Sequence, residues 1–414
     1  MSRLLTYSFI FISILSVVFG FIINEDLSTG GATYDFNLTM NVVKELTTGE
    51  FENYYRYTKH FPLHYWLLSL IYNFFNDEFV LRIFYLIFSS LFPIFVYLNL
   101  KEIFGGKKNN ILLICFSLLF LPFFRSSAIW ANSHLTALIF LLIANYFYLK
   151  SLDGNKNYKF LNLFFLALST YSVQSFAIFY IFYLFQYNKN SSTKELIIIL
   201  FFCLLLSIPG LIFISSNIGL RSLYGLDFTN NIGYTLISNF SIIFFYYCFF
   251  FINKQNLIIL KNCFYKTKKI EVCILFLLFI ISIYFYYYYA EGIPSTGRGF
   301  FYKLSFFLFQ NNLLFFLTSF LGMYVSLLIL KKEIKFLYII ILVNIMSSHY
   351  VVFQKYFEPI FILSIFILFK NFLSENILNF KKNTFIFVCV VFTYFLFAVI
   401  NIIFNISSNL PYSM

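Results

Sequence analysis

The chain has 414 residues, of which 61% are hydrophobic and only 11% are charged, and its formal net charge is +12. Soluble domains carry roughly a quarter charged residues, so this composition excludes an ordinary soluble protein. Apolar runs of 15 to 22 residues recur from Leu4 to Ile403, and each can cross roughly 30 Å of hydrocarbon. The sequence therefore predicts an all-α, polytopic transmembrane helical bundle that forms one domain over residues 1–414.

The first apolar run, Leu4–Ile23, follows Arg3 and has no small-residue cleavage pattern after it. We interpret it as a retained signal anchor, which delivers residues 24–78 to the outer side as the first extracytoplasmic loop. Within this loop, the passage from Glu25 to Trp66 holds six of the chain's 17 acidic residues and two of its four histidines. Ionisable groups concentrated beside a bilayer mark functional sites, so we expect the active site here.

Two helices are expected in this first loop. Over Asp35–Thr48, Leu38, Val42 and Leu46 recur at helical spacing. Pro62–Phe75 reads as an almost wholly apolar helix, which at about 14 residues is short for a span. We therefore expect both helices to lie along the outer interface. The apolar residues of the second helix share one stripe: Leu63, Trp66, Leu67, Leu70 and Phe74.

The remaining apolar segments predict about 11–13 spans in total. Phe160–Phe185 is too short for two full crossings, and we interpret it as a helical hairpin whose tip, TYSVQS, stops at the outer side. The other predicted segments are Phe79–Leu100, Ile111–Phe124, Trp130–Leu149, Leu196–Ser215, Ile232–Ile252, Val272–Ala290, Leu313–Leu330, Phe336–Met346, Tyr356–Phe369 and Thr384–Ile403.

The charge distribution supports this topology. The loops assigned to the cytoplasm carry 20 basic and six acidic residues, or 20 − 6 = +14, and the outer side carries nine basic and eleven acidic residues, or −2. This is the positive-inside bias of a multi-span protein. The basic net charge therefore indicates membrane orientation, and we expect no nucleic-acid partner.

The inner loops exclude some classes of enzyme. They contain no GxxxxGK[ST] motif, no glycine-rich phosphate loop and no paired acids, which a nucleotide-dependent enzyme or pump would need. The six cysteines show no CxxC spacing, so neither a disulfide framework nor a zinc site is indicated.

An ordered set of motifs follows the first span. Asp35 is followed by Gly49, the segment YRYTKHFPLHYW from Tyr55 to Trp66, and Arg82 in DEFVLR, and a late element FQKYFEPIFIL begins at Phe353. In this order they resemble the GT-C superfamily of integral-membrane glycosyltransferases, in the style of lipid A aminoarabinose transferases and protein O-mannosyltransferases. The resemblance implies a sugar taken from a lipid-phosphate donor.

Three positions depart from the pattern of that superfamily. Phe36 stands where many relatives have a second carboxylate. The outer end of the fourth span has Asn132 and His134 in WANSHL where relatives often have an Asp. The hairpin tip has Tyr171 and Gln174 where a Lys is common. The site is therefore expected to depend on one carboxylate.

On this resemblance we predict a catalytic Asp35, which would deprotonate the acceptor hydroxyl. The predicted substrate-binding residues are Lys59, His60, His64, Arg82, His134, Arg298, Lys355 and Tyr356. The expected partners are a polyprenyl-phosphate-sugar donor, membrane lipids and a glycolipid, saccharide or protein acceptor. No cofactor is indicated, apart from the alternative of a divalent metal. We expect a multi-pass protein of the bacterial inner membrane with an extracytoplasmic active site.

Simpler roles remain open for these residues. Asp35 can be the N-cap of the helix that follows it, a role that Asp fills well. His60 and His64 are four residues apart on a helix, a spacing that can share a metal ion. Arg82 can extend to lipid headgroups, and Lys355 can be an ordinary loop cation.

Two other functions are alternatives to the transferase. A flippase of lipid-linked saccharide would need charged or broken helices at the bilayer midplane, which are scarce in this sequence. A polymerase or ligase of the O-antigen type would use outer-loop residues such as Arg221 and Arg298.

Overall fold

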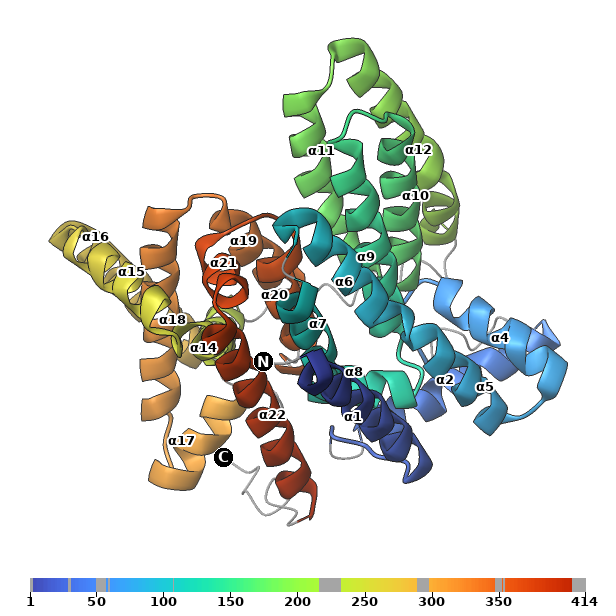
Figure 1. Cartoon of the computed structure of the whole chain (residues 1–414), viewed down its shortest axis with the longest axis horizontal. Helices are drawn as coiled ribbons and strands as arrows, with labels where there is room; N and C mark the ends of the chain where they lie inside the picture. The colour runs from blue at the N-terminus through green and yellow to red at the C-terminus, as the bar shows by residue number, and fades with distance from the viewer. Residues whose placement is uncertain are drawn as a thin grey trace. The chain divides into compact units, whose positions relative to one another are not determined.

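The computed structural model describes residues 3–28, 31–49, 57–58, 60–106, 108–215, 232–288, 298–346, 352 and 354–403, with the backbone alone at Arg3, Lys355 and Tyr356. All regular elements among these residues are helices, which confirms the predicted all-α class (Figure 1). The chain divides into an N-terminal unit, Ser2–Gly225, and a C-terminal unit that runs from Leu226 to Met414. Whether the two units form the single domain predicted over residues 1–414 stays a prediction.

The N-terminal unit holds the first loop and the hairpin. Its helices are α1 (Arg3–Ile22), α2 (Gly31–Thr48), α4 (Leu63–Phe75), α5 (Glu78–Ser89), α6 (Leu91–Phe104), α7 (Lys108–Ser117), α8 (Pro122–Ile129), α9 (Ser133–Ser151), α10 (Asn157–Ser172), α11 (Phe179–Asn190) and α12 (Thr193–Ser215), with 3-10 turns η1 (Leu118–Phe120) and η2 (Gln174–Ile178).

The C-terminal unit is built around α14. Its helices are α14 (Ile232–Phe251), α15 (Lys254–Tyr265), α16 (Lys269–Tyr288), α17 (Phe300–Phe309), α18 (Leu313–Lys332), α19 (Phe336–Met346), α20 (Gln354–Ile367), α21 (Phe372–Asn379) and α22 (Lys381–Ile403).

Eight helices among the described residues are long and apolar enough to cross a membrane, or up to ten if each of two bent helix pairs counts as one span. The chain is therefore a multi-pass membrane protein. The sequence predicts about 11–13 spans because it also counts the hairpin arms and the short apolar helix α19. Those helices have 16, 12 and 11 residues, fewer than a straight span requires.

One predicted span is broken. The segment expected to run straight over Ile111–Phe124 is bent by 65° between η1 and α8. Pro122 explains the bend, because a proline disfavours the helical conformation of the residue before it, and Leu121 is extended with ψ 127°. All eight residues of α8 are buried. The bend therefore inserts α8 into the core of the unit.

The hairpin is present as predicted. Helices α10 and α11 are joined through η2, so the tip falls at Val173 and Gln174. Helices α10, α11 and α12 run side by side (Figure 1). The hydroxyl of Tyr171 donates a hydrogen bond to the carbonyl of Leu206, which fixes the C-terminal end of α10 against α12.

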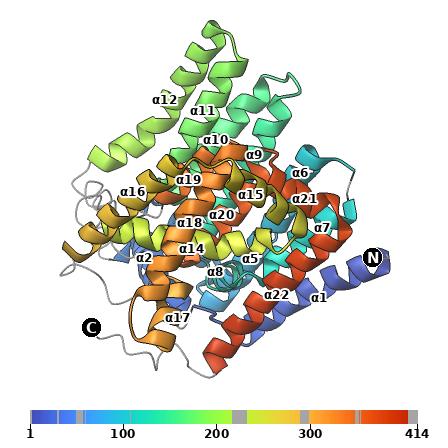
Figure 2. The ribbon, with the colours of Figure 1, turned by 90° about the vertical axis from the view of Figure 1, so that its left-hand side faces the viewer.

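Helix α14 contacts α16 on one side and α18 on another (Figure 2). A Cβ on Gly233 would lie 2.4 Å from the backbone oxygen of Ser282, and one on Gly322 would lie 2.0 Å from that of Phe240. Both glycines therefore allow backbone-to-backbone approach that no larger residue permits. Such close contacts between helices are typical of small residues in membranes.

Candidate active site

The candidate site begins where α1 ends. Asn24 adopts a left-handed conformation with φ +53°, and the N–H of Glu25 donates to the carbonyl of Gly20 at 2.8 Å. Such a turn satisfies a free carbonyl at a helix end, and Asn tolerates the conformation better than most residues. The turn sends the Glu25 carboxylate back toward α8.

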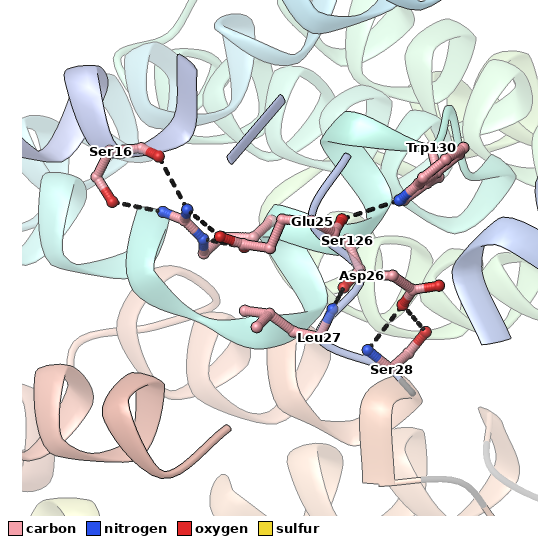
Figure 3. Close-up of polar contacts among 8 residues, drawn as sticks. Ser16, Glu25, Asp26, Leu27, Ser28, Ser126 and Trp130 are labelled. Atoms are coloured by element: carbon pink, nitrogen blue, oxygen red, sulfur yellow. Dashed lines mark hydrogen bonds and ion pairs between the residues drawn. The ribbon is translucent and has the colours of Figure 1, made fainter. Parts of the chain in front are cut away.

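Arg125 of α8 receives that carboxylate in a buried, two-pronged ion pair. Its Nε and Nη2 lie 2.5 and 2.7 Å from the two Glu25 oxygens. Its Nη1 and Nη2 also donate to Oγ and the backbone oxygen of Ser16 on α1, at 2.9 Å each. Figure 3 shows this network together with the bond from Trp130 Nε1 to the Glu25 carbonyl, 2.9 Å long.

Asp26, next along the same segment, accepts from the N–H and the hydroxyl of Ser28 (Figure 3) and also caps α2. Its Oδ2 accepts from the backbone N–H groups of Ala32 at 3.1 Å and Thr33 at 2.9 Å. Helix α2 therefore begins at Gly31, and the predicted start at Asp35 is wrong by four residues. The alternative role of Asp35 as the N-cap is also wrong, because Asp35 is the fifth residue of the helix.

Asp35 is half-buried one turn into α2, and it acts electrostatically on Tyr65 of α4. The Tyr65 hydroxyl shares a 2.6 Å hydrogen bond with Oγ1 of Thr58 and another with Ser133. Burial, aided by the negative charge of Asp35, raises the pKa of Tyr65 to about 12. Tyr65 is therefore a neutral phenol that connects the carboxylate with the start of α9.

Helix α4 turns its predicted apolar stripe outward. Trp66, Leu70 and Phe74 are 49%, 59% and 85% exposed, whereas His64 and Tyr65 are buried. An outward stripe on a short helix is what an interfacial helix presents to lipid. Neither α2 nor α4 is among the candidate spans.

His64 lies in a closed network. Its Nε2 donates to the Ala131 carbonyl at 3.0 Å, and its Nδ1 accepts from the Thr136 hydroxyl at 2.9 Å. Burial lowers the pKa of His64 to about 3, so the ring is neutral. Both nitrogens already have protein partners, so a substrate contact would require this network to open. The predicted binding role of His64 stays a prediction.

His60, His134 and Gln174 come together from three separate segments. The Nδ1 of His60 donates to Oε1 of Gln174 at 3.2 Å, and the rings of His60 and His134 meet edge to face with centroids 5.0 Å apart. The N–H of His60 also donates to Thr58, the partner of Tyr65. The two positions that depart from the superfamily pattern at the fourth span and the hairpin tip thus lie in one polar cluster. We call Thr58, His60, Tyr65, Ser133, His134 and Gln174 the polar cluster.

Arg82 is buried among aromatic rings. Its guanidinium lies 3.9 Å from the ring centre of Trp130 and 5.9 Å from that of Phe36. Its Nε donates to the Ile129 carbonyl and its Nη1 to Oδ1 of Asn24. It therefore does not extend to headgroups as an exposed arginine would. Phe36, at the position where a second carboxylate would match the superfamily pattern, thus lies beside this guanidinium.

Four predicted substrate-binding residues remain: Lys59, Arg298, Lys355 and Tyr356. Lys59 is outside the described residues, as are the side chains of Lys355 and Tyr356 on α20. Arg298, in the C-terminal unit, is 6% exposed, lies 4.3 Å from the ring centre of Tyr302 and donates to Tyr286 at 3.1 Å. These residues keep their predicted roles as predictions.

No group of three His, Cys, Asp or Glu side chains that could hold a metal ion occurs among the described residues. His60 and His64 do not share such a site there, because His64 turns both nitrogens to protein atoms.

Sequence reasoning missed the Glu25–Arg125 pair and the capping by Asp26. A signal for the pair was present, since Arg125 is a lone charge in the apolar run LPFFRSSAIW and Glu25 follows the first span. Charged residues in such positions usually pair with one another.

Residues 59–213 match the model of the family described as dolichyl-phosphate-mannose-protein mannosyltransferase. Over these residues the chain is similar to that family. The mannosyltransferase family is one of GT-C membrane glycosyltransferases that use a lipid-phosphate sugar donor, so the match supports the predicted superfamily and the predicted glycosyltransferase activity.

The match to the mannosyltransferase family begins at Lys59 and ends in α12. It covers the part of the polar cluster from His60 onward, but neither Asp35 nor the C-terminal unit. No curated protein and no solved structure matches the chain.

Proposed function

We propose that the enzyme transfers a sugar from a polyprenyl-phosphate carrier to a hydroxyl of a glycolipid, saccharide or protein at the extracytoplasmic face. Asp35 takes the proton of the acceptor hydroxyl as general base. The acceptor oxygen then bonds to the anomeric carbon, and the bond from that carbon to the phosphate oxygen breaks. The polyprenyl phosphate leaves, and the configuration at the anomeric carbon is inverted.

The observation that carries this proposal is the electrostatic interaction of Asp35 with Tyr65 of the polar cluster. Asp26 caps α2, and Asp35 lies one turn further along the same helix. Its charge acts on Tyr65, which belongs to the polar cluster. A half-buried carboxylate beside hydroxyl and imidazole groups is suited to accept a proton from a bound sugar or Ser/Thr hydroxyl.

His60, His134 and Gln174 are assigned to the sugar hydroxyls of the donor or acceptor. All three present hydrogen-bonding groups and none of them needs a charge for that purpose. Lys59, Lys355 and Arg298 are assigned to the donor phosphate, where cations stabilise the negative charge that develops as the carrier leaves. No step is assigned to a metal ion.

The two alternatives are less well supported. A flippase does not require a base and is not what the family match describes. A polymerase or ligase of the O-antigen type is likewise not what the family match describes.

The test replaces Asp35 with Asn in native membranes and measures sugar transfer per folded enzyme. We expect a loss of about 10²-fold or more, as for removal of a general base. Asp153→Asn, the same change at an exposed carboxylate after α9, is the matched control and should transfer normally. Normal transfer by well-expressed Asp35→Asn enzyme would rule out the proposed mechanism. Mass spectrometry of envelope glycans with and without the protein then identifies the acceptor.

A further inference from the structure

We propose that Glu25 and Arg125 are positioning residues for the transfer reaction. Their ion pair fixes the segment Asn24–Ser28, and through it the start of α2 and the location of Asp35 relative to the polar cluster. This inference rests on the proposed role of Asp35 as the base.

The ion pair is buried and holds several groups at once. The side chain of Arg125 is 1% exposed and that of Glu25 is 11% exposed. The guanidinium binds both oxygens of Glu25 and two oxygens of Ser16, so it joins the end of α1 to α8. Two parallel hydrogen bonds to a carboxylate define its direction as well as its distance. Gly20 leaves the necessary space, since a Cβ there would lie 2.7 Å from Nη2 of Arg125.

The segment after α1 is fixed residue by residue. Asn24 accepts from Arg82, the carbonyl of Glu25 accepts from Trp130, and the N–H of Leu27 donates to Oγ of Ser126 at 3.0 Å. All three partners belong to α5, α8 or the residue after α8. The backbone on both sides of Asp26 is therefore tied to the core of the N-terminal unit.

Asp26 transmits this placement to α2. Its carboxylate holds the N–H groups of Ala32 and Thr33, and Asp35 follows two residues later in the same helix. Arg125 also lies on the helix that leads through Trp130 into Asn132–His134, the edge of the polar cluster. The same ion pair thus fixes the segment that leads to Asp35 and the helix that leads to the polar cluster.

A conservative change separates positioning from folding. Glu25→Asp keeps the charge pair but shortens the side chain by about 1.5 Å, so the pair can close only if Asn24–Ser28 moves. A shift of about 1 Å in a reacting group can lower a rate by about 10²-fold. We expect kcat to fall about tenfold or more while KM for a polyprenyl-phosphate-sugar donor stays within about twofold. Arg125→Lys, which keeps the charge but loses the two-pronged geometry, should behave in the same way.

Glu195→Asp is the matched control, because Lys159 and Glu195 form another largely buried pair in the N-terminal unit, between α10 and α12. It should fold as well as Glu25→Asp and keep the kcat of the parent enzyme. Melting temperature and detergent-extracted yield are measured for every variant. The inference is overturned if Glu25→Asp and Arg125→Lys have the same kcat per folded protein as the control.

Asp35→Asn, assayed alongside, distinguishes the two proposals. If Asp35→Asn transfers normally, the proposed function fails, whatever the Glu25 variant does. If Asp35→Asn is inactive and Glu25→Asp is fully active, the proposed function stands and only the positioning role is wrong.

Discussion

Asp26 and Asp35 are nine residues apart, and only the structure separates their tasks. An N-cap usually binds N–H groups two or three residues ahead, but Asp26 reaches N–H groups six and seven residues ahead. No local sequence signature describes that reach, so the capping role was assigned to the wrong aspartate as an alternative. The motif order, in contrast, was sufficient to select Asp35 as the candidate base.

His64 should make the folded protein sensitive to acid. Its pKa is about 3 in the folded state and about 6.5 when unfolded. Between these values the unfolded state binds more protons, so stability is full above pH 6.5 and declines as the pH falls. From pH 7 to pH 4.5 the loss attributable to His64 is about 2.5 kcal/mol.

The measurement compares thermal unfolding of the parent enzyme and His64→Gln in detergent at pH 7 and pH 4.5. Gln can donate to Ala131 and accept from Thr136 but does not titrate. The variant should lose less stability than the parent on acidification. Equal losses would show that His64 is not the group responsible.

At the scale of elements, the helices of the first loop were largely predictable. The stripe of Val42 and Leu46 packs against Tyr65, as the spacing of α2 predicts. The bend between α7 and α8 was not predicted, although Pro122 in the sequence indicates a break at this point. Helices α15 and α21 were missed because their residues are too polar to resemble spans and lie in regions that were interpreted as loops.

Caps on two neighbouring helices give a paired prediction. Asp26→Ala removes the cap of α2, and Asp77→Ala removes the cap of α5, where Asp77 accepts from Phe79 and Val80. Each change should lower the free energy of unfolding by about 1 kcal/mol. Only Asp26→Ala should also lower transfer per folded enzyme, because only α2 carries Asp35.

Unfolding curves and donor-dependent transfer rates check both changes. Equal activity of the two variants would mean that the start of α2 does not control the reaction.

At the scale of the molecule, hydropathy and charge were enough to identify a helical membrane protein, because each span must satisfy its own backbone hydrogen bonds. The number of spans was not settled by sequence, because an apolar run does not tell a straight helix from a bent or short one. Likewise, the meeting of His60, His134 and Gln174 depends on tertiary packing, which a single sequence does not specify.

The predicted orientation can be tested by labelling. In a background without the six native cysteines, Asn73→Cys in α4 and Gly106→Cys after α6 place thiols at exposed positions. The positive-inside bias predicts that a membrane-impermeant maleimide labels the first in intact cells and the second only after permeabilisation. The reverse pattern would place the candidate site on the cytoplasmic side.

The glycines at the α14 contacts have a consequence for how this sequence can change over generations. The chain has 64 phenylalanines and 33 tyrosines, and many face outward, where another bulky apolar side chain would serve equally well. At Gly233 and Gly322, in contrast, a single methyl group would collide with the main chain of the neighbouring helix. Over generations, most outward-facing aromatic residues are therefore expected to be exchanged for other bulky apolar residues, whereas Gly233 and Gly322 are expected to remain glycine.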